Sequence, residues 1–351
     1  IFLYYPLKKM SRNTRFILSG VITGDVKEFL LEFRETIREG NVEVVWNSYQ
    51  KFNQKTEETF RVSSWPQPSL IRKELNIDMK NVYDISFMIL YKELYFRHLF
   101  ERCQINYYDQ KNSFKNYYSL FNKLLISIND DDDAFPLIPN KWLWDMINSF
   151  VSQFQYFQYW KTLDSSKKVL RNKTKELREV WSVRRVLDAL HALVDGAKIK
   201  LKYNKDVSND NSPGSAIGYF CLVGLLRVHT ITCDYTSGIQ VMSQLDLTRK
   251  TIITHILSSF YTAHYYLSFC YIMTRRYNDG HSLLSTLLSR YQRQAFKRNF
   301  GKATADIIDE GKNNKNTDET EQDLFIKRYL TDDAMLEKSY ALLAIAFTLY
   351  P

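Results

Sequence analysis

The chain has 351 residues, of which 48 are Lys or Arg and 39 are Asp or Glu, so its formal net charge is +9. Apolar residues make up 45% and charged residues 25%, which is the usage of a folded globular protein and excludes a disordered or collagen-like chain. Only 11 Gly and 7 Pro interrupt the chain, which leaves room for long helices and favours an all-α fold.

Cysteine spacing and hydropathy exclude several classes of protein. The cysteines form no CxxC pair, so neither a zinc ribbon nor a disulfide framework is indicated, and a reducing interior fits better. The longest apolar run, residues 216–226, is far shorter than the roughly 20 residues of a membrane span, so we expect no membrane segment. Residues 1–7 are apolar but precede Lys8 and Lys9, the reverse of a secretory signal, and a chain that starts at Ile1 is expected to be a fragment at that end. The four cysteines are Cys103, Cys221, Cys233 and Cys270.

A basic tail, residues 1–20, precedes a predicted N-terminal helical block over residues 21–202. Apolar residues recur at helical spacing from 26 to 37, and Gly40 is expected to end that helix. A second helix over 42–60 runs into the sequence WPQP, where two prolines require an extended connection. A third helix, starting near Asn81, carries a wide aromatic stripe.

The second half of this block contains two further predicted helices. Asn140 follows a proline and is expected to cap one of them, and Gly196 is expected to close the other. The four carboxylates of residues 130–133 lack the spaced ligands of a calcium loop, so we interpret them as a solvated loop. The segment 167–178 is rich in Lys and Arg, but Glu176 lowers its positive charge, so it is a weaker candidate for a basic binding surface.

The polar stretch 203–216 is predicted to be the main internal boundary. Residues 217–300 are predicted to form tetratricopeptide-like helical hairpins, residues 301–323 a flexible insertion, and residues 324–351 the start of further helices. Because an end repeat with an exposed apolar face needs a neighbour, we expect more protein or a partner after Pro351.

Small residues spaced along the chain indicate how these hairpins pack. Ser268 and Gly280, 12 residues apart, would let two antiparallel helices approach closely, while larger residues fill the groove. Gly224 and Gly238 are 14 apart, so the preceding unit would need a longer turn through residues 230–234. The alternative is that any amphipathic helical hairpin produces this pattern. The residues expected to pack the hairpins are Gly224, Gly238, Leu267, Ser268, Tyr271, Gly280, Leu284 and Leu287.

Enzyme signatures are absent from the sequence, including GxGxxG, GxxxxGK[ST], HExxH and GxSxG. Cys270 could act as a nucleophile with His264 or His281 as base and Asp279 as the orienting carboxylate. His264 falls on a different side of an ideal helix from Cys270, and a buried cysteine usually acts as a small apolar residue. The six histidines have no recurrent metal spacing. We therefore expect no catalytic residue, no cofactor, no metal and no small-molecule substrate.

One basic stripe is a candidate binding surface. Its four cations fall at offsets 0, 3, 7 and 8, which places them on one helical face with aromatic residues interleaved. Such a stripe could neutralise RNA phosphates or an acidic protein surface, but the solvated side of an amphipathic helix has the same pattern. A helical-repeat protein that binds RNA or the ribosome through this stripe is the alternative to a protein scaffold. The stripe consists of Arg290, Arg293, Lys297 and Arg298.

Several segments, in the same order, resemble the L subunits of eukaryotic translation initiation factor 3. They are ILYKELYFRH (89–98), PNKWLWD (139–145), QFQ (153–155), GYFCLVGLLRVH (218–229), RRY (275–277) and ALLAIAFTLYP (341–351). The resemblance implies a cytoplasmic, non-catalytic scaffold built as a right-handed, tetratricopeptide-like array of the PCI type. The resemblance also implies that the partners are other PCI-type subunits of the factor and the small ribosomal subunit. It does not decide whether the protein contacts rRNA or mRNA directly. The winged helix that ends the PCI region of this family has no counterpart in this chain.

Overall fold

The computed structural model describes residues 22–61, 63–103, 105–129, 135–164, 179–203, 213–243, 245, 256–309 and 333–349. Every regular element in these residues is an α-helix, so the all-α prediction is confirmed, and no winged helix lies in this part of the chain. The described residues fall into two compact units, 22–228 and 229–349, called the N-terminal and C-terminal units below.

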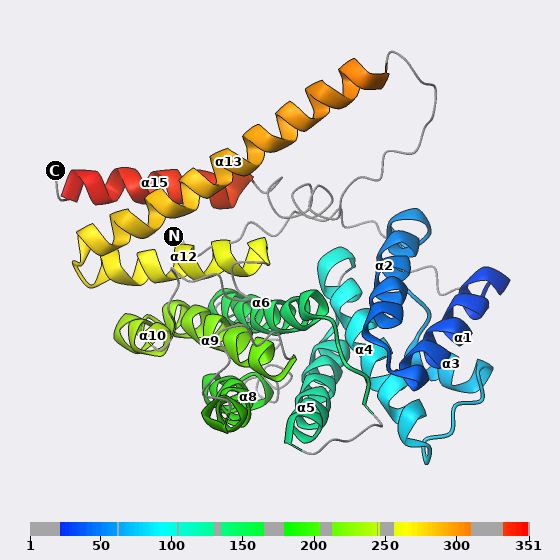
Figure 1. Cartoon of the computed structure of the whole chain (residues 1–351). Coiled ribbons are helices and arrows are strands. Elements are labelled where there is room, and N and C mark those ends of the chain that lie inside the picture. The colour runs from blue at the N-terminus through cyan, green and yellow to red at the C-terminus, as the bar shows by residue number, and fades with distance from the viewer. Residues whose placement is uncertain are drawn as a thin grey trace. The chain divides into compact units, whose positions relative to one another are not determined.

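The N-terminal unit is a stack of helices around α4 (Figure 1). Helix α4 contacts α1, α3, α5 and α6 and is buried on most sides from Asp84 to Leu99. Helices α5 and α8 lie side by side. The helices of this unit are α1 (Gly24–Glu39), α2 (Val42–Glu58), α3 (Pro68–Glu74), α4 (Val82–Arg102), α5 (Tyr107–Asn129), α6 (Asn140–Asp164), α8 (Val183–Tyr203) and the greater part of α9 (Pro213–Ile231).

Local capping explains where several of these helices begin and end. The side chains of Asn41 and Asn81 accept hydrogen bonds from the backbone N–H of Glu43 and Tyr83, both at 3.0 Å, and so cap α2 and α4. Gly40 adopts a left-handed conformation with φ of 70° and ends α1, as predicted.

Two predicted helix ends differ in the structure. Helix α6 begins at Asn140 itself, and the carbonyl of Pro139 accepts from the N–H of Leu143 at 3.0 Å. Gly196 does not close its helix, because α8 continues to Tyr203. A Cβ on Gly196 would lie 2.7 Å from Cδ2 of Leu125, so this glycine allows α5 and α8 to pack closely.

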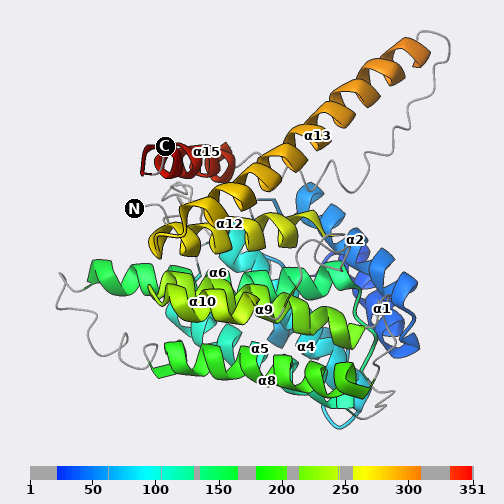
Figure 2. The same ribbon diagram turned by 60° about the vertical axis from the view of Figure 1, so that its left-hand side comes forward.

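The C-terminal unit contains α10 (Tyr235–Met242), α12 (Leu257–Met273), α13 (Tyr277–Asp309) and α15 (Asp333–Leu349). Figures 1 and 2 show α12 and α13 as an antiparallel pair, with α15 beside α13. Helix α10 packs against α12. The helical hairpin is therefore the unit of packing here.

The predicted domain limits are only partly visible. Helix α9 begins at Pro213, inside the polar stretch 203–216, and α13 continues to Asp309, inside the predicted insertion 301–323. The other calls lie outside the described residues, namely the tail 1–20, the acidic run 130–133, the basic segment 167–178 and residues 310–332.

Candidate interaction site

The α12–α13 hairpin brings together the small residues that the sequence singled out. A Cβ on Gly280 would lie 3.2 Å from the carbonyl oxygen of Ser268 and 2.8 Å from Cγ1 of Ile272. Leu267, Ser268, Leu284 and Leu287 are all buried in this hairpin. The two backbones approach closely at Gly280, and the leucines fill the space along the contact.

The turn between α12 and α13 is a Schellman motif with an unusual residue. Arg275 has φ of 64°, its N–H donates to the carbonyl of Ile272 at 3.0 Å, and the N–H of Arg276 donates to that of Tyr271 at 2.8 Å. Glycine is the usual residue at this left-handed position. The guanidinium of Arg276 lies 4.4 Å from the ring centroid of Tyr271 and pairs with Asp279.

The same motif recurs 42 residues earlier, between α9 and α10. Cys233 has φ of 64°, and the N–H groups of Cys233 and Asp234 donate to the carbonyls of Thr230 and His229 at 3.2 and 2.9 Å. Gly238 and Gly280 follow their left-handed residues by the same interval, and both are buried. The two turns are equal in length, so the longer turn expected after Gly224 is wrong.

Gly224 packs elsewhere. A Cβ on Gly224 would meet Ile147 and Val151 of α6 and Leu190 of α8, at 3.2, 3.5 and 3.6 Å. Its close approach therefore serves the packing of α9 on α6 and α8 within the N-terminal unit.

The basic stripe is only partly exposed. The guanidinium carbon of Arg290 lies 4.2 Å from the ring centroid of Phe260, and burial lowers the pKa of Arg290. Arg293 is exposed, and its Nε donates to the carbonyl of Ser289 at 3.2 Å. Lys297 and Arg298 belong to α13, but their side chains lie outside the described part of the chain. Arg290 thus contributes to packing within the C-terminal unit.

The four residues considered for catalysis each contact a different neighbour. The thiol of Cys270 is buried 3.1 Å from Oγ1 of Thr230, and burial raises its pKa to about 11. Nδ1 of His264 lies 2.9 Å from the carbonyl of Phe260, and burial lowers the pKa of His264 to about 4. Asp279 pairs with Arg276, and the ring of His281 packs on Phe347 at 4.5 Å. Burial therefore keeps the thiol protonated at neutral pH, and both candidate bases contact other groups.

The described residues form neither a metal-binding cluster nor a membrane-spanning helix. No group of three or more His, Cys, Asp or Glu side chains there could hold a metal ion. No helix in the same ranges is long and apolar enough to span a bilayer.

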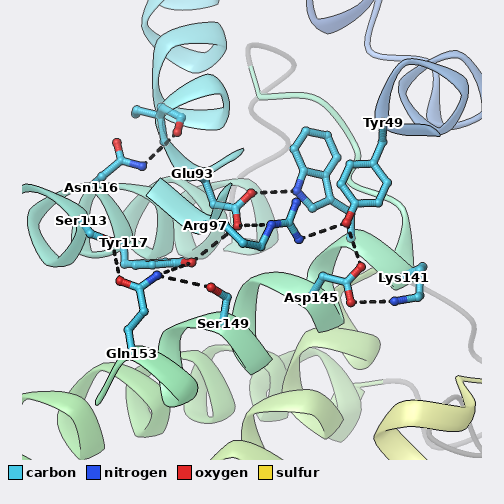
Figure 3. A network of polar contacts seen from close by, with 12 residues as sticks. Tyr49, Glu93, Arg97, Ser113, Asn116, Tyr117, Lys141, Asp145, Ser149 and Gln153 are labelled. Atoms are coloured by element: carbon cyan, nitrogen blue, oxygen red, sulfur yellow. Dashed lines mark hydrogen bonds and ion pairs between the residues drawn. The ribbon is translucent and has the colours of Figure 1, made fainter. Parts of the chain in front are cut away.

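A buried charged network, which sequence reasoning missed, joins four helices of the N-terminal unit (Figure 3). Glu93 and Arg97 of α4 form an ion pair at 3.4 Å, with side chains 0% and 8% exposed. Arg97 also donates to the hydroxyl of Tyr49 at 3.0 Å, and Tyr49 donates to Asp145 at 2.8 Å. Lys141 donates to the other oxygen of Asp145 at 2.6 Å. Helices α2, α4 and α6 therefore meet at one chain of charge-assisted hydrogen bonds.

Neutral groups satisfy the rest of this network. The indole N–H of Trp142 donates to Glu93 at 3.0 Å, and the hydroxyl of Tyr117 on α5 approaches the same carboxylate at 3.5 Å. Gln153 accepts from Ser113 at 2.7 Å. Every polar atom in such a network needs a partner, because an unpaired buried charge is costly.

Burial and charge contacts act in opposite directions on this pair. Burial raises the pKa of Glu93, and the guanidinium of Arg97 and the indole N–H of Trp142 oppose that rise. Burial acts to lower the pKa of Arg97, but Glu93, Tyr49 and Asp145 outweigh it and raise that pKa. The network therefore stabilises a charged guanidinium inside an aromatic core.

A second buried arginine binds α9 to α6. Arg227 is 6% exposed and donates to Asn148 at 2.8 Å, to Ser152 at 3.1 Å and to Gln155 at 2.7 Å. Because the acceptors occur along one face of α6, the planar guanidinium fixes the register of α9 on that helix.

The residues of both sets come from segments that resemble the L subunits. Glu93 and Arg97 lie in 89–98, Trp142 and Asp145 in 139–145, and Arg227 in 218–229. The signal that could have found them is a Glu and an Arg four residues apart inside an otherwise apolar, aromatic stripe. These residues lie in the core of the N-terminal unit, so part of the resemblance concerns the packing of that core.

Comparison with known proteins decides the family. Residues 109–351 match the model of a family described as RNA polymerase I-associated factor PAF67, which is more than half of the chain. The chain belongs to this family.

Three curated relatives of this PAF67 family member carry the same name. A protein named eukaryotic translation initiation factor 3 subunit L from Nematostella vectensis is 32% identical over 93% of this chain and 58% of its own length. Proteins of the same name from Drosophila pseudoobscura pseudoobscura and Danio rerio are 35% and 32% identical over 77% and 86% of this chain, and over 51% and 49% of their own lengths. The resemblance to L subunits is confirmed, and the chain spans about half the length of these relatives.

Proposed function

We propose that this protein is a non-catalytic scaffold subunit of eukaryotic translation initiation factor 3. It supports assembly of the factor and its recruitment to the small ribosomal subunit, and it works in the cytoplasm. Its partners are the other subunits of the factor, including those of the PCI type. The observation that carries the proposal is the match to L subunits over 93% of the chain.

The geometry of the described residues supports binding over turnover. Its conspicuous polar groups, Glu93, Arg97 and Arg227, are buried and fix helices against one another. The thiol of Cys270 is buried and protonated at neutral pH. Rigid stacked helices of this kind present extended surfaces to partner proteins.

The test is affinity capture of the tagged protein from cytoplasmic extract, followed by identification of the proteins that copurify. The expected result is recovery of other subunits of translation initiation factor 3 together with small-subunit ribosomal proteins. Recovery of RNA polymerase I, to which the family description refers, without any initiation factor subunit would contradict the proposal.

The basic stripe is tested in the same experiment. Charge reversal of Arg290, Arg293 and Lys297 to Glu should weaken binding if the stripe contacts RNA or an acidic subunit. The difference from the parent should be largest at low salt and shrink as salt rises, because salt weakens the charge contacts of the parent. Because Arg290 packs on Phe260, Arg293→Glu alone is the matched variant that leaves this stacking intact. A double Arg184→Glu, Arg185→Glu variant on α8 controls for a change in net charge. Unchanged association of both stripe variants would assign the stripe to solvent.

A further inference from the structure

The outer face of α5 carries the two most exposed aromatic side chains in the described residues. Tyr108 is 67% exposed and Tyr118 is 57% exposed. Every other large apolar residue in this part of the chain is less exposed. The ring of Tyr107 meets that of Tyr108 edge to face, with centroids 5.4 Å apart, and so supports it. Two aromatic rings in water, on a rigid helix, need an explanation other than core packing.

Apart from Ile126, which is 43% exposed near the C-terminal end of α5, the rest of this face is polar and cationic. At 100° per residue, Asn112, Lys115, Ser119 and Asn122 fall on the same side of α5 as the two tyrosines, and none of the face residues is a carboxylate. Among the described residues, no carboxylate lies within ion-pairing distance of Lys115 or Lys123. We call the set Tyr108, Asn112, Lys115, Tyr118, Asn122 and Lys123 the α5 platform.

The opposite sides of α5 are occupied, which fixes the platform outward. The carbonyl of Gln110 accepts from the indole of Trp181 at 3.2 Å, and Leu125 packs on Gly196, so one side lies on α8. The side chain of Asn116 donates to the carbonyl of Ile89 on α4 at 3.0 Å. These contacts leave the tyrosines and Lys115 facing away from both neighbours.

We propose that the α5 platform binds single-stranded RNA. Tyr108 and Tyr118 are separated by about 15 Å along the helix, which leaves space for several nucleotides between two stacked bases. Unpaired bases stack on exposed aromatic rings, lysines between the rings neutralise phosphates, and asparagine side chains donate to and accept from base edges. The charge of the platform is wholly positive, which complements a polyanion.

The platform fits this ligand better than the basic stripe of α13 does. Arg290 of the stripe already covers the ring of Phe260, whereas the rings of Tyr108 and Tyr118 are exposed. A duplex would not suit the platform, since paired bases cannot stack on a side chain. The inference goes beyond the scaffold role, because binding by the purified chain needs no other subunit.

The experiment measures fluorescence anisotropy of a labelled single-stranded RNA of mixed sequence, and of the matching RNA duplex, with the purified full chain at about 0.1 M salt. The double variant Tyr108→Ala, Tyr118→Ala should bind the single strand at least tenfold more weakly, since each stacked base contributes about that factor. Tyr108→Phe with Tyr118→Phe should retain the affinity. Lys115→Ala should reduce the slope of log affinity against log salt by about 0.7.

Control variants separate the platform from other surfaces and from misfolding. Tyr340→Ala removes another exposed tyrosine, which is 44% exposed on α15, and Arg293→Ala removes an exposed cation of the stripe. Both should bind like the parent, and all variants should show the circular dichroism of the parent. A parent that binds no single strand, or binds the duplex equally, overturns the proposal. A double variant Tyr108→Ala, Tyr118→Ala that keeps its RNA affinity also overturns the proposal. If that variant keeps its RNA affinity but no longer copurifies with other subunits, the platform is a protein-docking surface.

Discussion

Gly280 of α13 lies against the backbone carbonyl of Ser268 on α12, where an added Cβ would be 3.2 Å from that oxygen and 2.8 Å from Cγ1 of Ile272. A methyl group at this position must displace either backbone or a buried isoleucine. The close approach of α12 and α13 therefore depends on the absence of a side chain at Gly280.

Gly280→Ala should destabilise the C-terminal unit. The substitution gains up to about 1 kcal/mol of helix propensity, but overpacking of a tight contact costs about 1–3 kcal/mol. We expect a net loss of about 1 kcal/mol in the free energy of unfolding, measured by urea titration, and a greater loss for Gly280→Val. Gly24→Ala is the matched control, because nothing lies within 4 Å of the Cβ that it would add. Equal effects of the two alanine variants would contradict this account.

Arg275→Gly should stabilise the same hairpin. Arg275 holds φ of 64°, which costs a residue with a side chain about 1 kcal/mol and costs glycine almost nothing. Its side chain is exposed, so little packing is lost. We expect a rise of up to about 1 kcal/mol in the free energy of unfolding. Arg276→Ala is the contrasting variant and should lower stability, since it removes the contacts with Tyr271 and Asp279.

The Glu93–Arg97 pair yields a test of coupling. Removing one partner leaves the other charge buried, so Glu93→Gln and Arg97→Met should each cost about 3–5 kcal/mol. The double variant should cost clearly less than the sum of the two, because it leaves no charge uncompensated. A double-mutant cycle by urea unfolding measures the difference, and simple additivity would show that the pair does not act as a unit.

The sequence predicted the helices well but not what joins them. The stripe of α4 follows from periodicity alone, whereas the chain from Tyr49 to Asp145 connects residues 96 apart in sequence, which no local pattern reveals. Gly196 shows the same limit, because a glycine that resembles a helix end is instead required by Leu125 of a neighbouring helix. The turn through residues 230–234 was expected, but its length was wrong, and the left-handed conformation of Cys233 was not foreseen because that residue is not glycine.

Acid should destabilise the C-terminal unit through His264. Its pKa falls from an ordinary value near 6.5 to about 4, so the unfolded chain binds the proton more readily than the folded one. Stability from this group is therefore present above pH 6.5 and is lost as the pH falls toward 4. Between pH 7 and 5 we expect a loss of about 2 kcal/mol, and His264→Gln should remove that part of the pH dependence. Urea titrations of the parent and the variant at the two pH values provide the measurement.

Arg227→Lys should destabilise the N-terminal unit although the charge is kept. The guanidinium of Arg227 donates from Nη1 to Asn148 and from Nη2 to Ser152 and Gln155, three acceptors spread along α6. A lysine ammonium is a single point that cannot reach all three with good geometry, and it is more strongly hydrated, so its burial costs more. Each acceptor left without its donor costs about 1–3 kcal/mol, and we expect a total loss in that range or above it.

Arg184→Lys on α8 is the matched control, because the Arg184 side chain is 91% exposed and pairs loosely with Asp188 at 3.7 Å. An exposed ion pair of this kind contributes at most about 1 kcal/mol, and lysine serves equally well there. If Arg227→Lys unfolds at the same urea concentration as this control, the hydrogen bonds of Arg227 to Asn148, Ser152 and Gln155 do not fix α9 on α6. Hydrogen exchange gives a second measurement. Loss of the Arg227 hydrogen bonds should speed exchange of the α9 amides that face α6, while the amides of α4 should keep their protection.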